Sequence, residues 1–111
     1  MIDLSFLEKF TKGDTRKMKR YINMYLNIAP KTFNTMKENI KSQDWEQLRI
    51  QAHSLKPQAD YMDIAKLKKV LGEIENEVQN GAYDSLKNLY DQALDCHVAS
   101  ERLLKLYVEK L

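Results

Sequence analysis

The segment around His53 carries the side chains of this chain that are best suited to chemistry. His53 follows Ala52 by one position, about 100° further round a helix, at the border between core and solvent. Arg49 and Lys56 lie four residues before and three residues after His53, so they are its neighbours on the helix surface. A nucleophilic imidazole beside two cations is suited to receiving a phosphoryl group. The apolar residues of the predicted buried face recur at spacings of three and four: Leu48, Ala52, Leu55, Ala59 and Met62.

A phosphoryl-accepting site makes two demands on these side chains. The imidazole must be neutral, so that one ring nitrogen keeps a lone pair, and positive neighbours disfavour the protonated ring. The same positive charges attract phosphoryl oxygens and offset the charge that develops during transfer. A lone histidine at this position is more often an ordinary boundary residue, and Arg49 is placed beside it by helical geometry alone. The rest of the chain must therefore support the hypothesis.

The N-terminal part of the chain predicts a short helix followed by a long one. Asp3 or Ser5 caps the first helix, and Gly13 ends it. Asp14 or Thr15 then opens the second. These assignments rest on two preferences: short polar side chains accept hydrogen bonds from free N–H groups at helix starts, and glycine adopts the left-handed backbone that ends helices.

Pro30 falls inside the apolar stripe of the long second helix. The stripe covers residues 18–40 and keeps its register across Pro30, which predicts one bent helix rather than two. A third helix follows over residues 45–61, capped by Ser42 or Asp44, and carries the candidate site.

Two more helices complete the chain. Asp63 caps the fourth, and Asn80-Gly81 ends it. The fifth begins near Tyr83 or Asp84 and continues to the C-terminus. Because the connections are short, consecutive helices should pack antiparallel. We expect an all-α fold, an antiparallel up-down-up-down four-helix bundle with a short additional N-terminal helix.

The composition limits the class of protein. The 111 residues suffice for one domain, which we expect to span residues 1–111. Three Gly and two Pro are too few for the turns of an all-β fold. A net charge of +2 does not by itself indicate a nucleic-acid or membrane partner. No apolar run approaches a membrane span, no secretory signal is visible, and the single Cys96 fits a reducing compartment, so we expect a cytoplasmic protein.

The run Ala52-His53-Ser54-Leu55-Lys56 resembles the His-x-Leu-Lys core of the histidine phosphotransfer (HPt) domain family. The resemblance extends to the predicted layout: a short first helix, a long second helix with a proline in its middle, and a third helix that bears the motif. It therefore covers nearly the whole chain.

Two positions depart from the family pattern. Pro57 stands where the family usually has glycine directly after the lysine, and Asp63 stands where it tends to have glycine ten residues after the histidine. In an unbroken helix the N–H of residue 57 would bond the carbonyl of residue 53, so Pro57 predicts a bend just after His53. These departures bear on the geometry of partner docking more than on the chemistry.

The resemblance implies a phosphocarrier without kinase activity of its own. His53 would accept a phosphoryl group from the aspartyl phosphate of a receiver domain and pass it to another receiver, with Lys56 beside the phosphate. The partners would be receiver domains of a hybrid histidine kinase or a response regulator, and they would hold the Mg²⁺, so we expect no cofactor in this chain. We further expect a monomer.

Receiver domains dock through an apolar patch ringed by charges, as the family implies. Ile50 and Pro57 are the candidate exposed apolar residues on the helix of His53. Arg49, Gln58 and Asp60 complete the candidate docking residues. Asp60 either pairs with Lys56, four residues before it, or meets the rim of the partner.

Two other functions remain open from the sequence. A helical-bundle adaptor would bind a signalling partner without covalent chemistry, and the two departures would favour it if they prevent docking. A nucleic-acid-binding domain would use the basic run over residues 12–20, although such a run is more often the solvated side of a helix. The second histidine, His97, is interpreted as a boundary residue, and Trp45 as a core residue.

Overall fold

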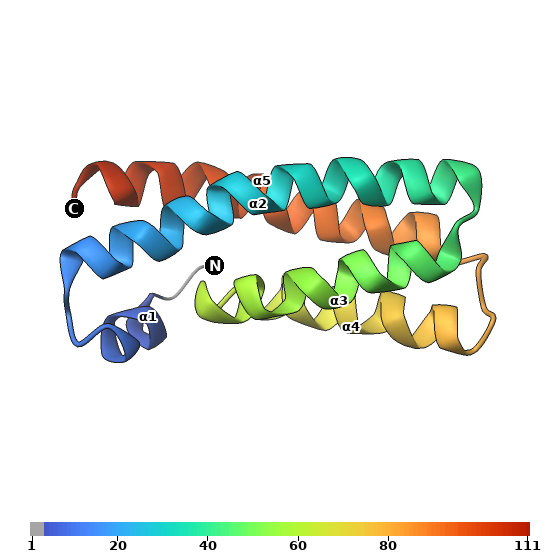
Figure 1. Ribbon diagram of the computed structural model, residues 1–111, viewed down its shortest axis with the longest axis horizontal. Helices are drawn as coiled ribbons and strands as arrows, with labels where there is room; N and C mark the ends of the chain where they lie inside the picture. Colours follow the sequence, from blue (N-terminus) through green and yellow to red (C-terminus); the bar gives the residue numbers. More distant parts are fainter. Residues whose placement is uncertain (1–3) are drawn as a thin grey trace.

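Four long helices form an antiparallel bundle, as predicted. The computed structural model describes residues 4–111, apart from the side chain of Phe6. Helix α2 packs on α3 and α5, and α4 packs on the same two helices. Successive long helices run in opposite directions (Figure 1). In the described range there are five helices and no strand: α1 (Ser5–Phe10), α2 (Thr15–Ser42), α3 (Trp45–Tyr61), α4 (Ala65–Gln79) and α5 (Leu86–Glu109).

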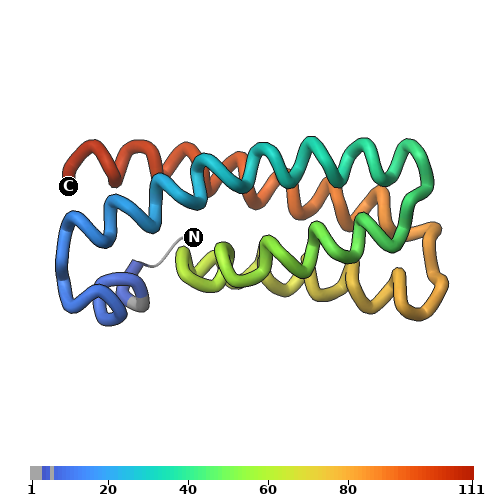
Figure 2. The backbone as a smooth tube through the Cα atoms, in the orientation of Figure 1, coloured from blue at the N-terminus to red at the C-terminus, as the bar shows by residue number. Residues whose placement is uncertain are grey.

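Helix α2 runs through Pro30 as one element of 28 residues, and its direction changes near its middle (Figure 1). The prediction of a single bent helix is confirmed. Helices α2 and α5 extend past the ends of α3 and α4, and α1 lies beneath the start of α2 (Figure 2). Three rings hold α1 in this place: Phe10 lies 5.5 Å from Tyr21 and 5.7 Å from Tyr61, centroid to centroid.

Two of the predicted helix caps are confirmed. The carboxylate of Asp14 accepts hydrogen bonds from the backbone N–H groups of Arg16 and Lys17, at 3.0 and 3.2 Å. The carboxylate of Asp44 accepts from the N–H of Gln47, at 3.2 Å, and so fixes the start of the helix that carries His53. A cap of this kind is worth about 1 kcal/mol.

The predicted cap of α4 is wrong. The N-cap is Ile64, which makes no side-chain capping bond, and Asp63 has a left-handed backbone with φ of 53°. Glycine adopts this conformation without steric cost, and Asp is among the few other residues that tolerate it. The tight turn accounts for a glycine of the kind that the resemblance led us to expect at this position, and Asp63 takes its place.

The predicted starts of α1 and α5 also need correction. Ser5 is the first residue of α1, whose N-cap Leu4 makes no side-chain bond, and Asp3 lies outside the described residues. Helix α5 begins at Leu86 rather than near residue 83 or 84. Tyr83 precedes the helix, and its ring stacks on Trp45 at the start of α3, with centroids 5.0 Å apart.

His97 lies inside the core rather than at its boundary, with only 4% of its surface exposed. Its Nδ1 lies 2.8 Å from the hydroxyl of Tyr25, and its Nε2 lies 3.4 Å from a carboxylate oxygen of Glu101. The ring stacks on Phe33 with centroids 4.9 Å apart. Burial lowers the pKa of His97, and the neighbouring Glu101 opposes this in part, while Lys105 adds to the lowering. This polar cluster joins α2 to α5.

Protonation of His97 should destabilise the folded protein. In the unfolded chain His97 has the ordinary histidine pKa of about 6.5, whereas burial lowers its pKa in the folded protein. The unfolded state therefore binds more protons than the folded state as the pH falls. Neutral His97 makes its full contribution to the free energy of unfolding above about pH 6.5, and this contribution is lost progressively below that pH. Urea unfolding across this range should show the decline in wild type and in His53→Gln, but a smaller decline in His97→Gln. An undiminished slope in His97→Gln would contradict the assignment.

A second stability prediction concerns Gly72, in the middle of α4. A Cβ added there meets no atom within 4 Å, so nothing in the fold requires glycine. Gly72→Ala should raise the free energy of unfolding by about 0.5–1 kcal/mol, because alanine loses less backbone freedom on folding. Gly81→Ala is the control: Gly81 has φ of 69°, so the same change there should destabilise. Urea denaturation distinguishes the two, and a loss of stability in Gly72→Ala would refute the prediction.

Candidate functional site

The imidazole of His53 lies on the outside of the bundle. Its side chain is 69% exposed, while Ala52 and Leu55, on either side of it in α3, are fully buried. The structure therefore places His53 where the apolar stripe predicts it, at the flank of the core. It differs sharply from His97, which the core encloses.

A carboxylate of the neighbouring helix holds both candidate residues. Glu75 lies in α4, and its side chain is only 13% exposed. Its Oε1 lies 3.1 Å from Nδ1 of His53 and 3.2 Å from Nζ of Lys56, and its Oε2 lies 3.3 Å from the same Nζ. One carboxylate thus fixes the imidazole and the ammonium group relative to each other, across the contact between α3 and α4.

Glu75 was not among the residues predicted from the sequence. A signal existed: Glu75 follows the buried Ile74 by one position, as His53 follows the buried Ala52. However, α4 also carries Glu73 and Glu77, and only the register between α3 and α4 determines which glutamate reaches His53. That register is set by the turn between the helices and cannot be read from helical spacing.

The hydrogen bond between Glu75 and Nδ1 favours one tautomer of the His53 ring. An ionised carboxylate accepts hydrogen bonds and cannot donate them, so Nδ1 of the neutral ring carries the proton. Nε2 then holds the lone pair. The exposed ring therefore offers a nucleophilic Nε2 while the carboxylate anchors the opposite nitrogen.

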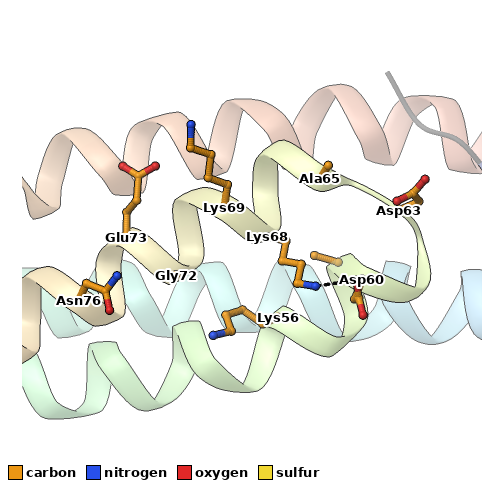
Figure 3. A pocket seen from close by; sticks show the side chains of 10 residues that line it. Lys56, Asp60, Asp63, Ala65, Lys68, Lys69, Gly72, Glu73 and Asn76 are labelled. Atoms are coloured by element: carbon orange, nitrogen blue, oxygen red, sulfur yellow. Dashed lines mark hydrogen bonds and ion pairs between the residues drawn. The ribbon is translucent and has the colours of Figure 1, made fainter.

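Lys56 lies at the edge of a groove between α3 and α4. Its side chain is 29% exposed and extends between the two helices, opposite Gly72 (Figure 3). The groove has a volume of about 540 Å³ and is lined by both helices and the turn between them. Asp60 does not pair with Lys56, one of its two predicted roles; it bonds Nζ of Lys68, at 2.9 Å (Figure 3). In the described part of the chain, Lys56 therefore pairs with Glu75 and with no other carboxylate.

Arg49 forms an ion pair with Glu46, one turn earlier in α3. This hydrogen bond raises the pKa of Arg49, and the charge of Glu75 adds a smaller contribution. The same bond lowers the pKa of Glu46. Arg49 thus lies on the α4 side of α3 within the field of Glu75, but it makes no bond to His53.

The other candidate docking residues lie away from α4. Ile50 is 40% exposed, and Pro57 is exposed on a helix that continues through it to Tyr61. Gln58 faces α2, where its Nε2 donates to Sδ of Met24 at 3.8 Å. Its buried Oε1 has no hydrogen-bond partner among the described residues. The predicted docking residues therefore fall on two sides of α3, with Arg49 and Asp60 on the α4 side.

Two further properties concern the whole described range. Within residues 4–111, no three His, Cys, Asp or Glu side chains gather in a way that could hold a metal ion. No helix in this range is long and apolar enough to cross a membrane.

The tautomer of His53 can be measured directly. In wild type, two-dimensional ¹H–¹⁵N spectra of the imidazole should show the proton on Nδ1, and Glu75→Ala should shift the population toward the Nε2–H form because the acceptor is lost. Glu73→Ala is the matched control, since it removes a carboxylate of the same helix that has no ion pair with His53. A wild-type ring protonated mainly on Nε2 would show that Glu75 does not control it.

Comparison with known sequences agrees with this geometry. A sequence model of the Hpt domain matches residues 20–109, which include all of α3, α4 and α5 and most of α2. No curated protein and no solved structure gives a significant match. Hpt domains are phosphocarrier modules that interact with receiver domains and are not autonomous kinases. The chain belongs to the Hpt domain family, the histidine phosphotransfer modules of two-component signalling.

Proposed function

We propose that His53 is the phosphoacceptor of this Hpt domain. It takes a phosphoryl group from the aspartyl phosphate of one receiver domain and passes it to another, in a multistep phosphorelay, and the chain acts as a monomeric cytoplasmic carrier. One observation supports this above all: the exposed His53 and the half-buried Lys56 share the carboxylate of Glu75. The arrangement places an exposed imidazole and a cation on one carboxylate.

The transfer step follows from the tautomer. The lone pair of His53 Nε2 attacks phosphorus, an N–P bond forms, and the P–O bond to the aspartate of the receiver breaks. The electron pair of that bond remains on the aspartate, which leaves as a carboxylate. The proton stays on Nδ1, so the ring becomes positively charged, and the carboxylate of Glu75 stabilises that charge at 3.1 Å. Transfer to the second receiver is the reverse sequence.

Lys56 stabilises the phosphoryl group. Its Nζ is 3.2 Å from the oxygen of Glu75 that also contacts His53, so the ammonium group lies beside the ring. When phosphoryl oxygens arrive, Lys56 contacts them and gives up part of its bond to Glu75. Removal of one preorganised charge donor typically lowers the rate of transfer by about 100-fold. The Mg²⁺ that the reaction needs belongs to the acidic pocket of the receiver.

The docking surface lies along α3 and the start of α2. Exposed apolar side chains line it: Ile50 and Pro57 near His53, and Met24 on α2, which is 38% exposed. It continues to Phe10, because that ring contacts Tyr61, eight residues after His53 and about 12 Å along the helix. A partner that covers about 800 Å² reaches both places.

Labelling by phosphorylated receiver domains tests the proposal. Wild type incubated with ³²P-labelled receivers from the same organism should acquire an acid-labile, alkali-stable label, and His53→Gln should acquire none. Lys56→Ala should be labelled about 100-fold more slowly, because it lacks the charge beside the phosphoryl group. Lys68→Ala is the matched control: it removes a lysine of the same groove that bonds Asp60, and its rate should be unchanged.

The outcome also separates a carrier from an adaptor. A label that persists in His53→Gln would refute the assignment of the acceptor. A folded wild-type protein that binds receivers and is labelled by none of them would instead be an adaptor without covalent chemistry.

A further inference from the structure

Positive charge gathers where α1 meets α2. Residues 8–20 contain six basic and two acidic residues, a net charge of +4. The rest of the chain contains 12 basic and 14 acidic residues, a net charge of −2. The molecule is therefore electrically asymmetric although its total charge is small. We call the six basic residues the basic segment: Lys9, Lys12, Arg16, Lys17, Lys19 and Arg20.

The charges of the basic segment are not neutralised within the protein. All six residues are exposed, and in the described part of the chain none of them forms an ion pair. Elsewhere in the described chain, five basic residues form ion pairs with carboxylates, among them Lys56 with Glu75 and Lys87 with Asp91. The field of the basic segment is thus available to a partner.

Two of these residues border the docking surface. Lys17 lies one turn before Tyr21, whose ring contacts Tyr61 of α3 at 5.3 Å. Arg20 lies one turn before Met24, which contacts Gln58 of α3. Both side chains therefore emerge on the side of α2 that faces α3.

The neighbouring surface of α3 carries no opposing charge. Gln51 and Ser54 lie two turns and one turn before Gln58 on the same side of the helix, and both are uncharged. The acidic residues near His53 are each paired: Glu46 with Arg49, Glu75 with His53 and Lys56, and Asp60 with Lys68 of α4. The α2–α3 side of the site is therefore positive, and the α4 side holds the paired carboxylates.

We propose that the basic segment selects receiver domains whose docking surface has an acidic rim. This inference rests on the proposed function, because it concerns the partner that reaches His53. A border with a net positive charge and no ion pair on its basic residues favours a negative partner and repels a positive one. Most of the segment precedes the part of the chain that matches the Hpt family model, which begins at residue 20.

An acidic protein fits this surface better than a nucleic acid does. The charges border exposed apolar side chains, Met24 at 38% and Phe10 at 51%, which a protein interface covers with its own apolar centre. Binding to a nucleic-acid duplex depends mainly on phosphate contacts and does not require such an apolar centre. The basic segment therefore forms a charged rim beside an apolar docking centre.

Reversal of the two bordering charges tests the proposal. In Lys17→Glu/Arg20→Glu, the efficiency of transfer from an acidic-rimmed phosphorylated receiver, at limiting receiver concentration, should fall about tenfold or more at low salt. The rate at saturating receiver should stay within about twofold, because His53, Lys56 and Glu75 are untouched. The deficit should shrink near 1 M salt, where the screening length falls to about 3 Å.

A matched pair on the same helix provides the control. Lys37 and Lys41 lie toward the other end of α2, beside α5, and line a separate hollow with Lys87. Lys37→Glu/Lys41→Glu changes the net charge equally and should leave transfer within about twofold of wild type. Circular dichroism establishes that both variants fold. An equal loss in both variants, or a loss in neither, would overturn the proposal.

Two further outcomes are distinguishable. If Lys17→Glu/Arg20→Glu transfers normally but loses salt-dependent binding of a fluorescent DNA or RNA duplex, the basic segment serves nucleic acid and the proposal is wrong. If wild type is never phosphorylated, the proposed function fails by itself. Titration of His53→Gln with unphosphorylated receivers still tests selection, and affinities unrelated to the acidity of the receiver rim would overturn it.

Discussion

The site depends on one carboxylate that two residues of the adjacent helix share. Glu75 contacts His53 and Lys56, so the geometry of the proposed phosphoacceptor is fixed by the register between α3 and α4. That register is set by a short turn, in which the N–H of Ile64 bonds the carbonyl of Ala59 at 2.9 Å and Asp63 adopts a left-handed backbone. A shift of one residue in α4 would move Glu75 about 100° round the helix and leave His53 without an anchor.

The two histidines occupy contrasting positions in this bundle. His97 lies inside, where Tyr25 and Glu101 satisfy both ring nitrogens and burial lowers its pKa, so its role is structural. His53 lies outside, with one nitrogen anchored and the other free. The contrast arises from the position of each residue around its helix. His97 is one of the buried residues of α5, whereas His53 directly follows Ala52, a buried residue of α3.

Helical spacing and capping chemistry predicted much of this from the sequence. The bounds of α3, the caps at Asp14 and Asp44, and the exposure of His53 depend on local preferences, which act within one helix. The identity of Glu75 and the burial of His97 depend on contacts between helices far apart in the chain, since Tyr25 and His97 are separated by 72 residues. The left-handed turn at Asp63 was missed because aspartate also suits a helix cap.

The central claim is that Glu75 leaves Nε2 of His53 as the reactive nitrogen, and the position of phosphorus tests it most directly. A ³¹P-coupled ¹H–¹⁵N spectrum of the phosphorylated, ¹⁵N-labelled protein identifies the nitrogen that carries the phosphoryl group. The account predicts phosphorus on Nε2 of His53, with the proton still on Nδ1. Phosphorus on Nδ1, or on any other side chain, would contradict it.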